Sequence, residues 1–286
     1  MSYKPSAWGA IRNMDSLEDM NALMDKWDIL SKNLKGRPLG LPIVLPDIFL
    51  ISDSGTGRTT FLSLLAGYLM NKPNLMDFYG DVEFFEFMLD YCPPQSGFGE
   101  IERFQRAVNA AKGFRNEYRG IVFVDLDEWV DHFEEKHFKA FMEYISDNSD
   151  EWMVVLSVSR GDNEKLAAFE AFISSYIRIE KVIIKRPTNE AFMEYLQGKL
   201  RAYGLELEED AYKIVLSTIG VLCNDRYFDG YKTVRLLCED IVYNVYTSGT
   251  DISKTLSARD VYVFASDGEY VKRFLAKMNR VSKIGF

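Results

Sequence analysis

Five short apolar runs, separated by stretches with helical spacing, most constrain how this chain can fold. The runs are Asp47–Ser52, Val82–Met88, Ile121–Val124, Met153–Val158 and Val182–Ile184, the last with a start anywhere from Ile177. Short, nearly continuous apolar runs are typical of strands buried on both faces of a sheet. Strands that alternate with helices form parallel sheets, because each crossover helix returns the chain to the same end of the sheet. We therefore expect an α/β fold with a parallel five-stranded sheet between two layers of helices.

The chain changes character after Pro187. Helical spacing continues in Thr188–Tyr203, Glu208–Thr218 and Tyr231–Tyr246, and no strand signal accompanies it. A further amphipathic helix is predicted over Asp15–Leu34, whereas the preceding residues show no periodicity. The sequence therefore predicts three parts: a flexible tail (1–13), an α/β domain (14–186) and a small all-helical domain (187–286).

Composition limits the classes of function. The 286 residues include 34 Lys and Arg against 43 Asp and Glu, which gives a net charge of −9. An acidic chain is a poor binder of nucleic acid or of anionic membranes, so we expect neither as a partner. No apolar run approaches the ~20 residues of a membrane span, and the N-terminus lacks the apolar core of a signal peptide. Three widely spaced cysteines without a Cys-x-x-Cys pair indicate a reducing compartment, so we predict a cytoplasmic location.

The segment after the first predicted strand carries the most informative motif. It reads Ser-Asp-Ser-Gly-Thr-Gly-Arg-Thr-Thr and leads into a helix predicted over Thr59–Met70. A glycine-containing turn between a strand and a helix points backbone N–H groups and the positive end of the helix at an anion. We predict that this segment binds the phosphates of ATP or ADP, with Arg58 at the P-loop lysine position and Thr59 as a Mg²⁺ ligand. The predicted binding residues are Ser52, Asp53, Ser54, Gly55, Thr56, Gly57, Arg58, Thr59 and Thr60.

This loop departs from the strict P-loop pattern GxxxxGK[ST] at two fixed positions. Ser52 stands at the first glycine position, and Arg58 stands at the lysine position. Arginine keeps the positive charge, but its planar fork replaces a compact point charge, which weakens the expected placement of a γ-phosphate. The alternative interpretation is a strand-to-helix turn that requires small residues and binds nothing.

Polar residues also end the third and fourth predicted strands. Asp125 follows Ile121–Val124, where a carboxylate can bind Mg²⁺ through water, and we predict it as the second metal ligand. The alternative is an acidic cap for the next helix, because further acidic residues follow it. Ser157 lies near the end of the fourth strand, and we predict that its hydroxyl orients a catalytic water.

These motifs resemble those of AAA+ ATPases, in particular the CbxX/CfqX type, which includes stage V sporulation protein K and red-type rubisco activases. The loop SDSGTGRTTF is similar to that family's GNPGTGKTT, and GIVFVD (Gly120–Asp125) is similar to its Walker B strand. The stretch DGYKTVR (Asp229–Arg235) resembles the lid motif GNxRxVR. The resemblance implies that residues 187–286 form a helical lid, with Lys232 at the sensor 2 arginine position, Arg235 beside it, and Ser157 at sensor 1.

The same resemblance implies that several catalytic groups are replaced. Leu126 follows Asp125 in place of the glutamate that polarises the attacking water, and Lys232 replaces the sensor 2 arginine. The arginine finger aligns with Ser174–Ile177, which contains no arginine, although Arg178 is nearby. An arginine finger alone is worth roughly 10³–10⁵ in rate.

We therefore expect an ATP-binding AAA+ protein with weak or partner-dependent hydrolysis, acting in protein remodelling or assembly. The alternative is a catalytically dead pseudo-ATPase that serves as an interaction or scaffold subunit. The resemblance alone implies protein partners or self-association into a ring.

Overall fold

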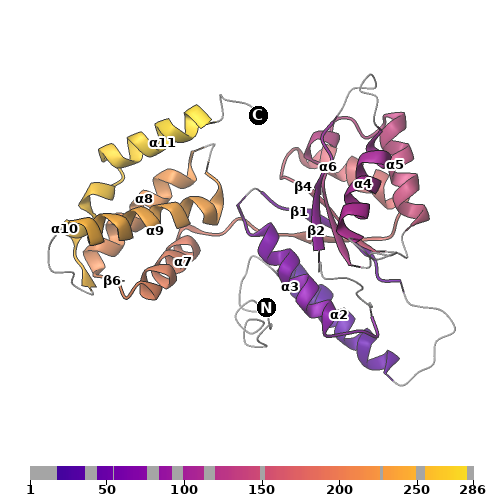
Figure 1. Cartoon of the computed structure of the whole chain (residues 1–286), viewed down its shortest axis with the longest axis horizontal. Coiled ribbons are helices and arrows are strands. Elements are labelled where there is room, and N and C mark those ends of the chain that lie inside the picture. Colours follow the sequence, from indigo (N-terminus) through magenta and orange to yellow (C-terminus); the bar gives the residue numbers. More distant parts are fainter. Residues whose placement is uncertain are drawn as a thin grey trace. The chain divides into compact units, whose positions relative to one another are not determined.

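The chain folds into two compact units in the computed structural model (Figure 1). The first comprises Met1–Asp53 and Arg58–Lys185, and the second comprises Ser54–Gly57 and Arg186–Phe286. The structure describes residues 18–35, 44–53, 55–75, 84–91, 99–112, 120–148, 152–225, 228–248 and 255–281. The predicted tail, residues 1–13, lies outside the described residues.

A parallel five-stranded sheet forms the centre of the first unit. Its strands are β1 (Asp47–Ile51), β2 (Phe84–Met88), β3 (Ile121–Asp125), β4 (Met153–Val158) and β5 (Ile179–Ile183). They lie in the order β2-β3-β4-β1-β5, and every neighbouring pair is parallel. The predicted α/β class with a parallel five-stranded sheet is thereby confirmed.

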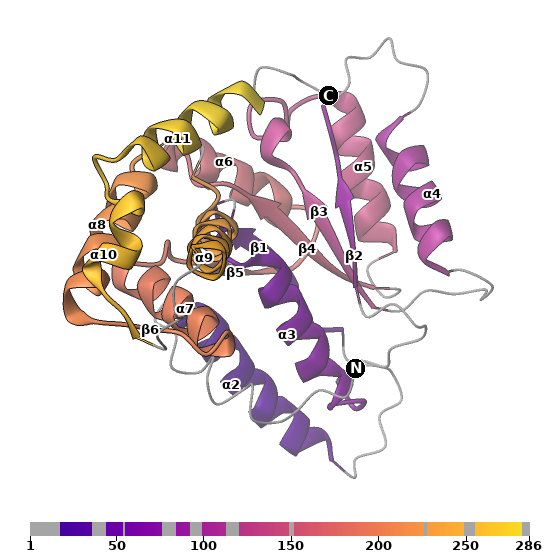
Figure 2. The same cartoon turned by 60° about the vertical axis from the view of Figure 1, so that its left-hand side comes forward.

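Helices cover both faces of this sheet (Figures 1 and 2). One face carries α2 (Glu18–Leu34) and α3 (Arg58–Met70), and the other carries α4 (Glu100–Lys112), α5 (Lys136–Asp147) and α6 (Asn163–Ser174). Successive residues of a strand point to opposite faces. In β1, Ile48 and Leu50 therefore pack with α2 and α3, whereas Phe49 and Ile51 pack with the helices of the other face. Burial on both faces explains why the inner strands β1, β3 and β4 read as apolar runs, whereas the edge strands β2 and β5 are partly exposed and contain charged residues.

The second unit is mostly helical. It contains α7 (Asn189–Ala202), α8 (Glu209–Cys223), α9 (Gly230–Thr247), the short α10 (Ala258–Val261) and α11 (Glu269–Val281). Its core includes Phe192, Val215 and Leu237, none of which is exposed. Among the described residues of both units, no helix is long and apolar enough to cross a membrane.

Two features of the second unit differ from the sequence predictions. A small parallel sheet joins β6 (Glu206–Leu207) to β7 (Thr255–Leu256), and two-residue strands are too short to give a periodic signal. Helix α8 continues through Gly220 to Cys223, although the sequence predicts its end at Thr218. Ile219 and Leu222 extend its buried face, and this packing outweighs the low helix propensity of Gly220.

A buried carboxylate lies at the start of β1. Asp47 is 5% exposed, and its Oδ1 accepts a hydrogen bond from the backbone N–H of Val154 at 2.7 Å. Burial raises the pKa of Asp47 to about 7, because it disfavours the charged form, and the Val154 hydrogen bond offsets only part of this effect.

We predict that the first unit loses stability as the pH rises through this pKa. In the unfolded chain the pKa of this carboxyl is about 3.9. Between that pH and about 7 the folded state binds the proton more tightly, so stability present at low pH is lost as the pH rises. Asp47→Asn should remove this loss, which amounts to up to about 4 kcal/mol above neutral pH.

Urea unfolding followed by tryptophan fluorescence measures this effect, because Trp27, Trp129 and Trp152 all lie in the first unit. Asp267→Asn, at an exposed position of the second unit, is the matched control and should keep the wild-type pH profile. An Asp47→Asn profile parallel to that of the wild type would contradict the prediction.

Candidate functional site

The carboxyl ends of β1, β3 and β4 meet at one edge of the sheet, which is where α/β proteins place their ligands. Ser52 follows β1, and its backbone N–H donates to the Val158 carbonyl at 2.9 Å. Asp125 ends β3 and lies in register with Ser157 of β4. Arg58 is the first residue of α3, the helix that follows β1. The fold of the first unit therefore brings Ser52, Arg58 and Asp125 together.

The side chain of Arg58 joins these strand ends through four hydrogen bonds. Its Nη1 donates to Asp125 Oδ2 at 2.7 Å, and its Nε donates to Ser52 Oγ at 2.9 Å. Its Nη2 donates both to the Ser52 carbonyl at 2.7 Å and to Ser159 Oγ at 3.0 Å. Only a planar guanidinium supplies this many donors in fixed directions. Arg58 therefore connects the ends of β1, β3 and β4.

Asp125 is held on both of its oxygens. Oδ2 pairs with Arg58, and Oδ1 accepts the backbone N–H of Asp127 at 3.1 Å. The Asp125 side chain is only 9% exposed, and the Arg58 side chain 17%. Burial is the largest influence and raises the pKa of Asp125, while the Asp127 N–H and the Arg58 charge act in the opposite direction. The pair is thus a largely buried ion pair.

Asp127 and Ser159 complete this network, and the sequence analysis did not assign them to the site. Ser159 Oγ donates to Asp127 Oδ2 at 2.7 Å, and the Ser159 backbone N–H donates to Asp127 Oδ1. Asp127 Oδ2 also lies 3.9 Å from Arg58 Nη2. Their only sequence signal is that both are polar residues shortly after predicted strands, Ser159 directly after Val158 and Asp127 three residues after Val124.

No described contact joins the Thr59 side chain to Asp125. Its Oγ1 donates instead to Glu86 Oε1 at 3.3 Å, and Glu86 belongs to β2. Glu86 has no motif in the sequence, and only the position of β2 beside β3 brings it near α3. The two predicted metal ligands, Thr59 and Asp125, therefore have different protein partners.

Ser157 is fully buried, and its Oγ has no hydrogen-bond partner among the residues that the structure describes. Because Ser157 and Asp125 are in register on adjacent parallel strands, their side chains point to the same face of the sheet. A buried hydroxyl without a partner is unusual in a folded protein.

The remaining loop residues have separate environments. Gly55 and Gly57 adopt positive φ angles of 71° and 104°, which glycine accepts more readily than other residues. Asp53 Oδ1 accepts the backbone N–H of Arg160 at 3.3 Å, and Thr60 is exposed. Thr56 is buried, and Ser54 lies outside the described residues.

Lys232 and Arg235 both lie on α9 of the second unit. Lys232 Nζ is 3.1 Å from Asp229 Oδ2, and Arg235 Nε is 3.5 Å from Glu239 Oε1. The first pair joins α9 to its N-cap residue and the second lies within the helix, so both are local. Their predicted sensor role stays a prediction.

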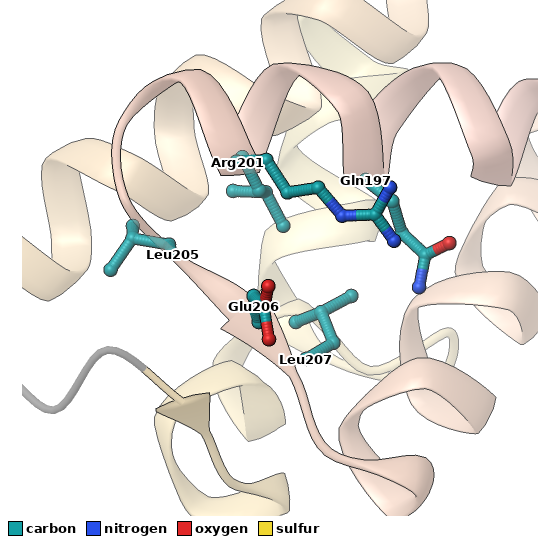
Figure 3. Close-up of a pocket in the computed structure, with 6 residues that line it drawn as sticks. Gln197, Arg201, Leu205, Glu206 and Leu207 are labelled. Carbon is teal, nitrogen blue, oxygen red and sulfur yellow. The ribbon is translucent and has the colours of Figure 1, made fainter.

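Two cavities lie away from these predicted residues. One, of about 70 Å³, lies in the second unit, where Gln197 and Arg201 project from α7 near β6 (Figure 3). The other, of about 250 Å³, lies in the first unit beside Trp27 of α2, with Arg178 and Glu180 in its lining. Neither cavity is lined by a residue predicted to bind nucleotide.

The sheet order, the covering helices, the loop between β1 and α3, and the helical second unit together define the AAA+ P-loop fold. The structure of Thermotoga maritima RuvB, described as a Holliday junction branch migration motor, is similar over 93% of this chain and 77% of that chain. Its TM-score is 0.50 at 13% sequence identity. A point mutant of the same RuvB gives a TM-score of 0.51 at 12% identity with the same coverage.

No protein-family model matches the sequence, and no curated protein matches it. At 12–13% identity, the similarity to RuvB establishes the fold and leaves the activity to be argued from the site. The CbxX/CfqX subtype therefore stays a prediction.

We predict that breaking the Arg58–Asp125 pair destabilises the first unit. Arg58→Met leaves the Asp125 carboxylate largely buried without its cation, which should cost about 3 kcal/mol of unfolding free energy. Combining it with Asp125→Leu removes the unpaired charge as well, so the double variant should regain most of this loss. Urea unfolding followed by tryptophan fluorescence measures both.

Lys165→Met is the matched control for this experiment. Lys165 Nζ lies 2.6 Å from Asp131 Oδ1, but both side chains are more than half exposed, so its loss should leave stability nearly unchanged. Equal effects of Arg58→Met and Lys165→Met would contradict the importance that we assign to the buried pair.

Proposed function

We propose that this chain is a nucleotide-binding AAA+ protein that binds ATP or ADP at the loop of residues 52–60. The observation that carries the proposal is the placement of Arg58, at the start of α3, against Asp125, at the carboxyl end of β3. Positive φ angles at Gly55 and Gly57 support it, because they allow a turn whose backbone N–H groups face a phosphate. The N-terminus of α3 adds a favourable dipole for an anion.

We also propose that hydrolysis is weak or requires a partner. Leu126 takes the place of the water-polarising glutamate, and its side chain is fully buried in the core with α5 and α6. The two acidic residues that follow Leu126 already accept hydrogen bonds from other protein groups. Asp127 holds Ser159, and Glu128 Oε2 accepts the backbone N–H of Tyr91 at 2.6 Å. No described carboxylate in residues 126–128 is therefore left to orient a water.

The second unit is proposed to act as the lid, with Lys232 and Arg235 as its basic residues. A role in protein remodelling or assembly, with protein partners or a ring of copies, is proposed from the family resemblance. The cytoplasmic location is proposed separately, from the three widely spaced cysteines. The buried, internally satisfied contacts of Arg58 favour a second candidate: a pseudo-ATPase that retains the fold as an interaction or scaffold subunit.

Isothermal titration calorimetry separates these two functions. We predict that ATP and ADP bind with a dissociation constant between about 1 μM and 1 mM, and that AMP, which lacks the β-phosphate, does not bind measurably. Phosphate release should stay below about 10⁻³ s⁻¹, because the groups that orient water are missing. The absence of heat with both ATP and ADP would reject nucleotide binding and favour the scaffold function.

A pair of glycine variants tests the loop itself. Gly57→Ala places a side chain at a φ of 104° and should weaken ATP binding by about tenfold or more. Gly198→Ala in α7 is the matched control, because an added Cβ there meets no atom within 4 Å. Equal affinity in the two variants would argue that nucleotide binds elsewhere.

A further inference from the structure

The contacts of Thr59 and Asp125 do not fit a site for Mg²⁺. In a P-loop, a threonine hydroxyl and a strand-end carboxylate hold the metal from two sides. Here the Thr59 hydroxyl is directed to Glu86, and both oxygens of Asp125 accept hydrogen bonds from protein groups. A metal at Asp125 would have to displace Arg58 or lie beside its positive charge.

Arg58 already supplies the positive charge that a metal would bring to this carboxylate. Its Nη1 lies 2.7 Å from Asp125 Oδ2, and its Nη2 lies 3.9 Å from Asp127 Oδ2. Low exposure of the Arg58–Asp125 pair limits screening by water. A second cation in the same place would therefore be repelled strongly.

One donor of Arg58 remains for a ligand. A guanidinium has five N–H groups, and four of them make the hydrogen bonds to Ser52, Asp125 and Ser159, which leaves one N–H on Nη1 without a hydrogen bond to any described residue. The buried Ser157 Oγ, on the same sheet face as Asp125, is a second polar group with no partner in the described part of the chain. The remaining N–H of Arg58, whose side chain is 17% exposed, is available to an oxygen atom of a ligand, whereas the Ser157 hydroxyl is enclosed by the protein.

We propose that Arg58 takes the place of the divalent cation in this site, so that the loop binds a nucleoside di- or triphosphate without a metal ion. This inference rests on the nucleotide binding proposed above and specifies its chemistry. The phosphates are bound by backbone N–H groups and by the remaining Arg58 donor. The Arg58 guanidinium, and not a metal ion, neutralises the Asp125 carboxylate.

The test compares nucleotide affinity with and without metal in the full-length wild-type chain. ATP and ADP are titrated calorimetrically in excess EDTA and, separately, in excess MgCl₂. We expect the two dissociation constants to agree within about threefold. In a parallel measurement, electron paramagnetic resonance of Mn²⁺ with ADP should detect no protein-bound ion.

Arg58→Lys tests the role of the guanidinium directly. Lysine has three donors and no planar fork, so it cannot hold Ser52, Asp125 and Ser159 together, and Asp125 becomes available to a metal. In this variant Mg²⁺ should strengthen ATP binding by about tenfold or more. The matched control is Arg273→Lys in α11, a side chain that is 82% exposed, which should keep the metal independence of the wild type.

The outcomes separate this inference from the proposed function. Binding that tightens more than about threefold with Mg²⁺ in the wild type, or a protein-bound Mn²⁺ signal, overturns the inference and leaves nucleotide binding intact. No binding of either nucleotide in either buffer overturns the proposed function and this inference together. Both wild-type measurements are independent of whether the Arg58→Lys variant folds.

Discussion

The ion pair between Arg58 and Asp125 is the interaction on which the organisation of the sheet edge depends. A buried charge pair is tolerated only where further hydrogen bonds satisfy both groups. Here Ser52, Ser159 and the Asp127 N–H provide them, so that residues following three different strands share one network. The start of α3 is thereby fixed relative to β1, β3 and β4. Arg58 thus has a structural role in connecting these elements.

An arginine and a lysine at position 58 would make different contacts. A lysine is a point charge on a flexible stem, free to follow a phosphate, whereas the fork of Arg58 is bound on both of its sides. The fold therefore indicates the architecture, whereas the chemistry has to be argued from the contacts of the site. The sheet order and the similarity to RuvB define an AAA+ architecture, whereas the proposal of weak hydrolysis rests on the contacts of Arg58 and the burial of Leu126.

The sequence predicted the features that depend on local residue patterns, such as the strands. It missed the contacts that depend on which strands are neighbours in the sheet. Runs such as Met153–Val158 are apolar because both faces of the sheet are covered, and that pattern is visible without a structure. The sequence placed Ser52 and Asp125 after predicted strands, but it did not predict the ion pair that Arg58 makes with Asp125. Glu86 near Thr59 depends on β2 pairing with β3, and the Asp127–Ser159 contact depends on β3 pairing with β4. No short-range pattern records these pairings.

The position of β1 has a consequence for how the chain is made. β1 is among the first elements in the sequence, yet both of its sheet neighbours come late, since Ile48 lies opposite Val155 in β4 and Glu180 in β5. During synthesis this apolar strand has no neighbour in the sheet until β4 has left the ribosome. The growing polypeptide therefore carries this apolar segment without its sheet neighbours while the residues between β1 and β4 are added.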